Sequence, residues 1–298
     1  MARTAKKPTA KKSKTKSSAA RTSRKSVSKK TTAKKPEAKS NLNRTVTLEK
    51  LYKFNIFAAV ANIIFAVLSV VFLSRESVSA VLTHATKDEL ASESATVLGT
   101  AYKTLLTVEV KYVLATIFLL SAVFSLLLAT RLRNNYENGV RNSSSLLRWL
   151  FMGIILGLVL EFVTLLAQVE DIMTLKLVAG LIITTTVLAW MAERENSGTK
   201  KRYNSFALSI FTGTIAWLPL LGSLIGSAIY GAGNLAWYVY LLSVVVLIGF
   251  ISICLTQYRQ IQQGVTAKGY LQLEGKYLST DFLIKLAVFV IILVALYK

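Results

Sequence analysis

The sequence has few of the residues that build common catalytic and metal sites. It contains one cysteine, Cys254, and one histidine, His84. A single cysteine excludes an intramolecular disulfide, and one cysteine with one histidine is too few for a metal coordination set. No Walker loop, nucleophile elbow or HExxH sequence is present. We therefore expect no metal centre and no enzymatic activity, and we interpret His84 as a solvated loop residue.

Acidic residues are also scarce, above all in residues 1–44. This stretch holds 16 lysines and arginines against one acid, Glu37, and so carries +15 of the net charge of +21. Its lysine, alanine, serine and threonine follow no apolar period, which predicts a disordered basic tail. Three roles stay open for the tail: a solvated determinant of topology, contact with anionic membrane lipid, and nucleic-acid binding.

Apolar residues, in contrast, are abundant and make up 53% of the chain, a fraction typical of membrane proteins. A hydrocarbon core of about 30 Å needs roughly 20 helical residues to cross it. The sequence has seven apolar segments, the fourth long enough only if its flanks join it, at about 54–73, 112–129, 146–167, 177–191, 206–229, 237–255 and 278–296. We predict an all-α fold in which residues 45–298 form one bundle of seven transmembrane helices.

The charges of the connections predict how the bundle is oriented. The tail and the connections at 131–148, 200–202 and 259–276 are net basic. The connections between them, at 75–111, 168–171 and 227–236, contain acids or no charge. By the positive-inside rule, this alternation places the N-terminus in the cytoplasm and the C-terminus outside. We expect a multi-pass protein of the cell membrane.

The last segment contains a lysine, Lys285, about a third of the way into the membrane. A charge at that depth costs several kcal/mol, so an intramembrane lysine indicates a functional site. Asp281 precedes it by four residues and therefore lies on the same helical face. Burial favours a neutral amine that attacks aldehydes to form a Schiff base, which a nearby aspartate stabilises once the imine is protonated. A plain buried ion pair explains the same residues equally well.

Two further charged residues belong to the third segment. Arg148 opens it on the same side of the membrane as Asp281, so the two side chains can share one hydrogen-bonded network. Glu161 lies thirteen residues further along, about 20 Å away, which is too far for a direct pair with Lys285. We interpret Glu161 as a neutral carboxylic acid bonded to a neighbouring helix, or as one that reaches an outer cavity.

Seven spans, an inside N-terminus and a lysine in the seventh helix resemble the heliorhodopsins, which are retinal proteins with an inverted orientation. The similarity covers residues 51–298, and it depends on the order and spacing of its anchors rather than on any one of them. They are Phe54-Asn55, residues 120–124, Arg148-Trp149, Ala167-Gln168, Trp190, Glu193, Gly213, Trp217, Gln257-Tyr258, Glu274, Tyr277 and Lys285.

The resemblance implies all-trans retinal bound to Lys285 as a protonated Schiff base. It also places Trp217 and Phe250 beside the retinal polyene, although ordinary aromatic core explains these two residues as well. The family has a carboxylate counterion three residues after the arginine of the third helix, where this chain has Phe151. The position four before the lysine is typically serine in the family and is Asp281 here. We infer that the counterion has moved to Asp281, with Arg148 tuning it.

These residues support one main hypothesis and two alternatives. The first is a light-sensing retinal protein that is not a pump, forms a homodimer and signals to a cytoplasmic partner. The second is a light-driven or light-gated transporter of protons or other ions that uses Asp281, Lys285 and Glu161 as a relay. The third is a retinal-free membrane anchor whose basic tail tethers lipid or nucleic acid.

Overall fold

The computed structural model describes residues 36–87, 98–198, 200–231, 235–263 and 267–297. Seven helices in this part of the chain are long and apolar enough to cross a membrane, which confirms the predicted seven-span bundle. The fourth predicted segment does gain its flanks, because its helix runs from Ile172 to Glu195. The elements are α1 (Pro36–Phe72), β1 (Ser77–Lys87), β2 (Leu98–Glu109), α2 (Val110–Ala129), α3 (Arg133–Arg141), α4 (Leu146–Leu166), α5 (Ile172–Glu195), α6 (Asn204–Tyr230), α7 (Trp237–Gln263) and α8 (Ala267–Leu296).

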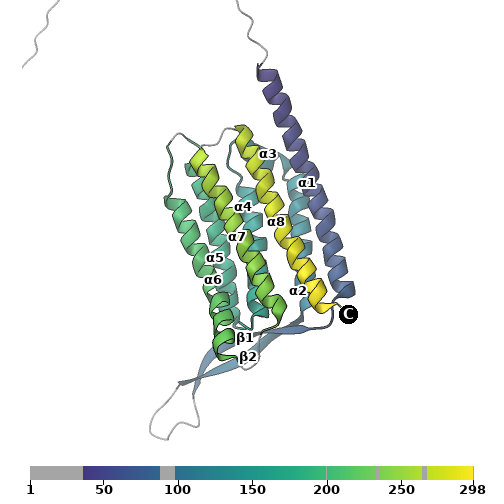
Figure 1. The fold of residues 1–298 in the computed structure, drawn as a ribbon, viewed down its shortest axis with the longest axis vertical. Helices are drawn as coiled ribbons and strands as arrows, with labels where there is room; N and C mark the ends of the chain where they lie inside the picture. Colours follow the sequence, from purple (N-terminus) through teal and green to yellow (C-terminus); the bar gives the residue numbers. More distant parts are fainter. Residues whose placement is uncertain (1–35, 88–97, 199, 232–234, 264–266, 298) are drawn as a thin grey trace, which may run out of the picture.

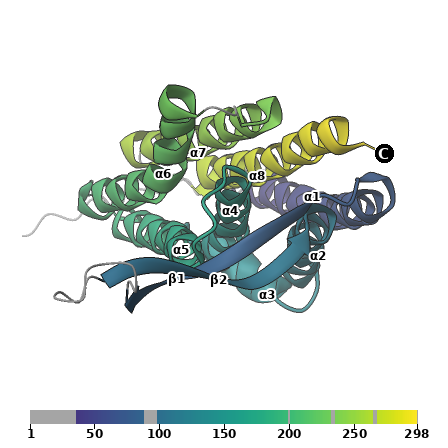
Figure 2. The same ribbon diagram turned by 90° about the horizontal axis from the view of Figure 1, so that it is seen from below.

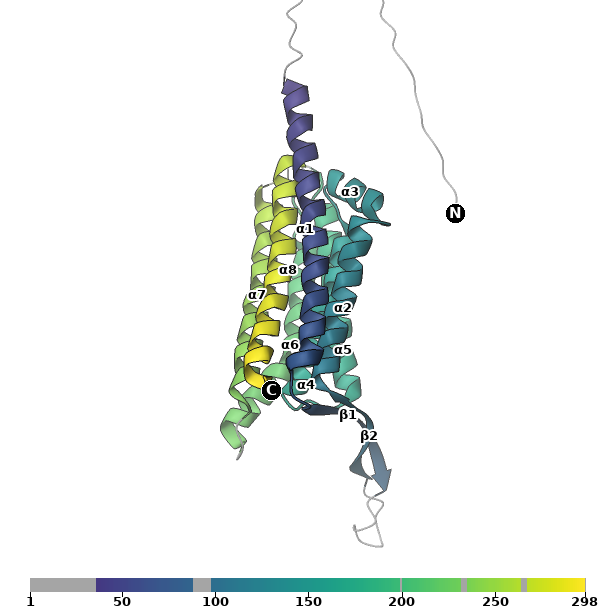
Figure 3. The same ribbon diagram turned by 90° about the vertical axis from the view of Figure 1, so that its right-hand side faces the viewer.

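The seven long helices stand side by side, and the two ends of the bundle differ (Figure 1 and Figure 3). The short helix α3 lies at one end, hereafter the α3 end. The hairpin of β1 and β2 lies at the other end together with the C-terminus, hereafter the hairpin end. Helix α1 begins at Pro36, so the last part of the predicted 1–44 tail is helical. Residues 1–35, on which the rest of the tail prediction falls, lie outside the described residues.

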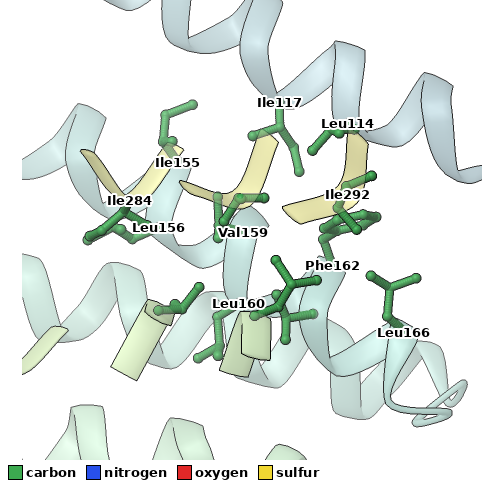
Figure 4. Close-up of a cluster of buried hydrophobic side chains, with 14 of the residues drawn as sticks. Leu114, Ile117, Ile155, Leu156, Val159, Leu160, Phe162, Leu166, Ile284 and Ile292 are labelled. Atoms are coloured by element: carbon green, nitrogen blue, oxygen red, sulfur yellow. The ribbon is translucent and has the colours of Figure 1, made fainter. Parts of the chain in front are cut away.

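Helix α4 forms the centre of the bundle, with other helices around it in the view of Figure 2. Two-thirds of its most apolar window (67%) is buried inside the protein, against 28–44% for the other spans. Its side chains meet those of α2 and α8 in the cluster that Figure 4 shows, which includes Ile117, Val159 and Ile292. Because lipid tails are as apolar as these side chains, close packing rather than exclusion of water holds the helices together.

Small residues let α4 and α5 approach closely. A Cβ added to Gly153 would overlap the Thr186 hydroxyl, and one added to Gly157 would lie 3.1 Å from the Ala179 carbonyl oxygen. This pair of glycines therefore serves helix packing, as its GxxxG spacing predicts. A Cβ added to Gly222 or Gly226, the second pair with that spacing, would meet no atom of another element within 4 Å among the described residues, so this pair does not serve helix packing within the chain.

The connection between the first two spans is an antiparallel β-hairpin rather than the long irregular loop that the sequence suggested. Its pairing runs from Ser77 opposite Glu109 to Lys87 opposite Leu98, and His84 lies within it. The hairpin is fastened to the bundle at Asp171, whose carboxylate accepts hydrogen bonds from the Thr174 amide (2.8 Å) and the Thr83 amide (3.4 Å). The Thr174 amide, by favouring the charged form, lowers the pKa of Asp171 and makes this residue the N-cap of α5.

Candidate functional site

Lys285 is buried in α8 and uses its amine for two hydrogen bonds. The Nζ atom donates to Asp281 Oδ2 at 2.5 Å and to the Ser121 hydroxyl of α2 at 2.6 Å. The spacing of four residues places Asp281 one helical turn from Lys285, so the predicted pair forms. The other carboxylate oxygen, Asp281 Oδ1, is buried and has no hydrogen-bond partner. Only one of the two carboxylate oxygens of Asp281 therefore has a hydrogen-bond partner in the described part of the chain.

This pair opens on a small polar cavity, hereafter the lysine cavity, with a volume of about 40 Å³. A volume of that size holds a water molecule or two. Phe151 lines it from α4 and stacks on Phe124, with ring centroids 4.3 Å apart. Among the described residues, Asp281 is the one carboxylate in the wall, which is formed by Asn55, Ser121, Phe124, Ser125, Leu128, Arg148, Phe151, Met152, Ile155, Leu278, Asp281 and Lys285.

A second cavity of about 30 Å³, hereafter the aromatic cavity, lies against the adjacent face of α4. Trp217 of α6 and Phe250 of α7 line it, with ring centroids 6.2 Å apart. Gly213 makes room for this arrangement, because a Cβ added there would lie 2.5 Å from the Phe250 ring. The structure therefore brings Trp217 and Phe250 together and places them in a different cavity from Lys285, Asp281 and Phe151.

Arg148 contacts carboxylates other than Asp281. Its guanidinium donates to Glu193 Oε1 of α5 at 2.9 Å and to Glu274 Oε2 of α8. All three side chains are buried. Its Nε atom has no partner, and the side chain shares the lysine cavity with Asp281. The expected tuning of Asp281 by Arg148 thus stays a prediction that rests on proximity, since none of the hydrogen bonds described for Arg148 reaches Asp281.

The sequence reasoning missed the chemical role of the two glutamates that hold Arg148. They lie 45 and 126 residues from Arg148 in the chain, so no local spacing reveals the contacts. The available signal is that Glu193 and Glu274 are acids at the ends of apolar segments on the same side as Arg148. The network extends through Trp149, Ser145 and Gln260 to Glu193, and through Tyr136 to Glu274. Burial raises the pKa of Tyr136, which keeps its hydroxyl proton.

Glu161 lies apart from both cavities. Its carboxylate forms an ion pair with Lys176 of α5 at 2.5 Å, near the hairpin end. It lines a separate cavity of about 290 Å³ whose wall includes Tyr112 and Lys176. The contact with a neighbouring helix agrees with the interpretation made from the sequence, whereas an ion pair with Lys176 does not agree with a neutral acid. The structure does not bring Glu161 together with Asp281 and Lys285.

Seven membrane-length helices with a buried lysine in the last one define a membrane protein of the rhodopsin class. The chain matches the Heliorhodopsin family model over residues 51–294 and belongs to that family. Among solved structures, it is similar to the transmembrane domain of the rhodopsin phosphodiesterase of Salpingoeca rosetta, with 13% identity, a TM-score of 0.55 and 88% of each chain covered. At that identity the likeness shows the fold alone. No curated protein matches the chain.

Membership of this family supports a retinal-binding rhodopsin, and the residues present fit that group. Lys285 offers a buried amine, and Asp281 offers a carboxylate with a free oxygen next to it. Trp217 and Phe250 offer aromatic faces for a polyene.

Proposed function

We propose that this protein is a light-sensing retinal protein, a photoreceptor rather than a pump or an enzyme. In this proposal Lys285 carries all-trans retinal as a protonated Schiff base and Asp281 is its counterion. The observation that carries the proposal is the contact of 2.5 Å between the buried Lys285 amine and the Asp281 carboxylate. When bound, retinal supplies absorption of visible light and an isomerisation that follows it.

The surroundings of Asp281 support its role as counterion. Phe151 stands where the third helix of the family provides a carboxylate, and Asp281 is the acid of the described chain that lines the lysine cavity. Its free Oδ1 atom is available to a second donor, so the carboxylate can stay ionised beside a cation. The Ser121 hydroxyl of α2 accepts a hydrogen bond from the Lys285 amine and helps to fix its position.

The position of Glu161 favours sensing over transport. A relay through Asp281, Lys285 and Glu161 needs contact between neighbouring members, and Glu161 is paired with Lys176 in a separate cavity. The transporter alternative keeps its own test, which is the pH change that illuminated proteoliposomes produce. A sensor is expected to give no sustained change, whereas a proton pump gives one that uncouplers abolish.

The family resemblance also suggests how the protein acts in its membrane. We propose a homodimer in the cell membrane with a cytoplasmic N-terminus, in agreement with the basic connections on that side. Isomerisation next to Lys285 would bias two arrangements of the helices, and a cytoplasmic partner would recognise one of them. The basic tail would contact anionic lipid on the same side.

Expression with all-trans retinal tests the proposal. We expect a visible absorption band that Lys285→Ala abolishes, because the covalent link is lost. The matched control is Lys176→Ala, which removes an exposed lysine near the hairpin end and should leave the band in place. A wild-type protein that stays colourless with retinal, or a Lys285→Ala variant that keeps the wild-type band, would overturn the assignment.

A further inference from the structure

The cluster of Arg148, Glu193 and Glu274 at the α3 end has an unbalanced charge if both acids are ionised. The exposed fractions of the three side chains are 2%, 0% and 0%. Two carboxylates and one guanidinium would leave one negative charge without a partner and without water. An uncompensated buried charge costs several kcal/mol, and a carboxylate in that position takes up a proton instead.

The hydrogen bonds of Glu193 and Glu274 decide which of the two acids holds this proton. The Oε1 atom of Glu193 accepts from Arg148 (2.9 Å) and from the side-chain amide of Gln260 (2.8 Å). Its Oε2 atom accepts from the Trp149 indole (2.9 Å) and from the Ser145 backbone amide (3.2 Å). All four of these partners are N–H donors, two on each oxygen, so a proton on either oxygen would displace one of them. The Tyr270 hydroxyl also lies near Glu193 and has no hydrogen-bond partner of its own. The four N–H donors favour the ionised form of Glu193.

Glu274 has a different set of partners. Its Oε2 atom accepts from Arg148, and its Oε1 atom lies 2.8 Å from the Tyr136 hydroxyl of α3. A hydroxyl can accept a hydrogen bond as well as donate one. Oε1 of Glu274 is therefore the carboxylate oxygen of this cluster that can carry a proton and still be satisfied. We infer that Glu274 is a buried proton-binding site, a neutral carboxylic acid whose O–H donates to Tyr136.

Once it accepts from Glu274, the Tyr136 hydroxyl needs an acceptor for its own proton. The buried Asn55 of α1 lies near this hydroxyl, and its amide nitrogen has no hydrogen-bond partner. A half-turn of the amide exchanges its oxygen and nitrogen without changing its shape, so Asn55 can accept the proton. Because Asn55 also lines the lysine cavity, a chain of polar groups joins Glu274 to the space beside Asp281 and Lys285.

The charges around Glu274 come from four helices and agree with one proton in the cluster. Helix α4 contributes Arg148 and helix α5 contributes Glu193. Helix α3 contributes Tyr136, whose hydroxyl stays protonated, and helix α8 itself contributes the phenols Tyr270 and Tyr277. With Glu274 neutral, Arg148 and Glu193 balance each other. The inference concerns the chain's own groups in the dark and does not depend on retinal.

Infrared spectroscopy of the full-length protein tests the inference directly. In an ester-free detergent, the carbonyl band of a protonated carboxylic acid lies above the amide I band and moves to lower frequency in deuterium oxide. We expect such a band in the wild-type protein and its loss in Glu274→Gln. The control Glu161→Gln, which alters an acid near the hairpin end, should keep it. A folded Glu274→Gln protein with the carboxylic-acid absorption of the wild type would overturn the inference.

A second variant decides the question if Glu274→Gln does not fold. Tyr136→Phe removes the hydroxyl that accepts from Glu274 and leaves the carboxylic acid in place. We expect the carbonyl band to move to higher frequency, because the acid loses its hydrogen bond. An ionised Glu274 has no such band, so a carboxylic-acid region unchanged by Tyr136→Phe would contradict the proton assignment.

Discussion

The protein buries two charged clusters of similar composition that differ in how completely their groups are satisfied. At the α3 end, every oxygen of Glu193 accepts hydrogen bonds, and the side chain is fully buried. Beside the lysine, Asp281 has one partner for one oxygen, and 16% of its side chain is exposed. The protein alone satisfies both oxygens of Glu193, although Arg148 Nε has no partner, whereas Asp281 keeps one oxygen without a partner.

The two clusters also differ in what they connect. The contacts of Arg148 join α4 to α5 and α8, so this cluster contributes to holding three helices together. Lys285 and Asp281 belong to one helix, and their pair joins nothing beyond the Ser121 hydroxyl. A pair within one helix contributes about 0.3–0.5 kcal/mol on a surface, far less than the cost of burying a lysine. The comparison therefore favours a structural role for the cluster around Arg148 and a functional role for the pair of Lys285 and Asp281.

The largest effect on stability is expected from Arg148→Leu. This change removes the cation that pairs with the buried Glu193, and removing one partner of a buried ion pair destabilises a protein by about 3–5 kcal/mol. Thermal unfolding in detergent measures the loss. The matched control is Lys176→Leu, which breaks a pair whose lysine is 60% exposed and should cost about 0–1 kcal/mol. Equal shifts for both variants would contradict the structural role of the α3-end cluster.

A smaller effect is expected at the aromatic cavity. Gly213→Ala forces the Phe250 ring to move, because the added Cβ would lie 2.5 Å from it. Overpacking of this kind costs about 1–3 kcal/mol. We expect a lower melting temperature together with a shifted visible band, since Phe250 flanks the proposed polyene. Gly222→Ala is the control, because a Cβ added there would meet no atom of another element within 4 Å among the described residues. It should change neither the melting temperature nor the visible band. A Gly213→Ala protein with wild-type stability would show that Phe250 is free to move.

The smallest effect is expected at Asp171, outside both clusters. Asp171→Ala removes the N-cap of α5 and the contact with Thr83, at a cost of about 1 kcal/mol. Its folded-state pKa lies below the ordinary value of 3.8, so the charged form contributes stability above that pH. This contribution is lost as the pH falls through the folded-state pKa. Melting curves of the wild type and Asp171→Asn should therefore converge in acid, and a difference that grew in acid would contradict the assignment.

The sequence predicts features that depend on local spacing and misses those that depend on distant contacts. Seven apolar runs reveal seven spans, and four-residue spacing reveals the pair of Asp281 and Lys285. The partners of Arg148 come from two other helices, and only folding brings them together. The hairpin escapes detection because the polar and apolar alternation of β1 breaks after Ala80, where Val81 and Leu82 follow and the pairing is irregular. Helix α3 is too short and too polar to resemble a span.

The residues proposed to hold retinal divide in the same way: the sequence suggests the grouping of some, and only folding shows the grouping of the others. Lys285, Asp281 and Phe151 share a cavity as their positions along the chain suggest, because α4 and α8 carry them to the same depth. Trp217 and Phe250 form their own cavity, since Gly213 lets α7 place an aromatic ring against α6. No spacing in the sequence shows that two small cavities lie on adjacent faces of α4 rather than one large one.

The visible spectrum of Asp281→Asn with all-trans retinal tests most directly whether Asp281, unlike the acids of the α3-end cluster, has a functional role. If the half-satisfied Asp281 is the counterion, the band should move strongly to the red, or the imine should lose its proton near neutral pH. Glu161→Gln, which alters the distant pair, should leave the spectrum as it is. An Asp281→Asn protein with the wild-type spectrum would contradict the account and assign the counterion to another acid.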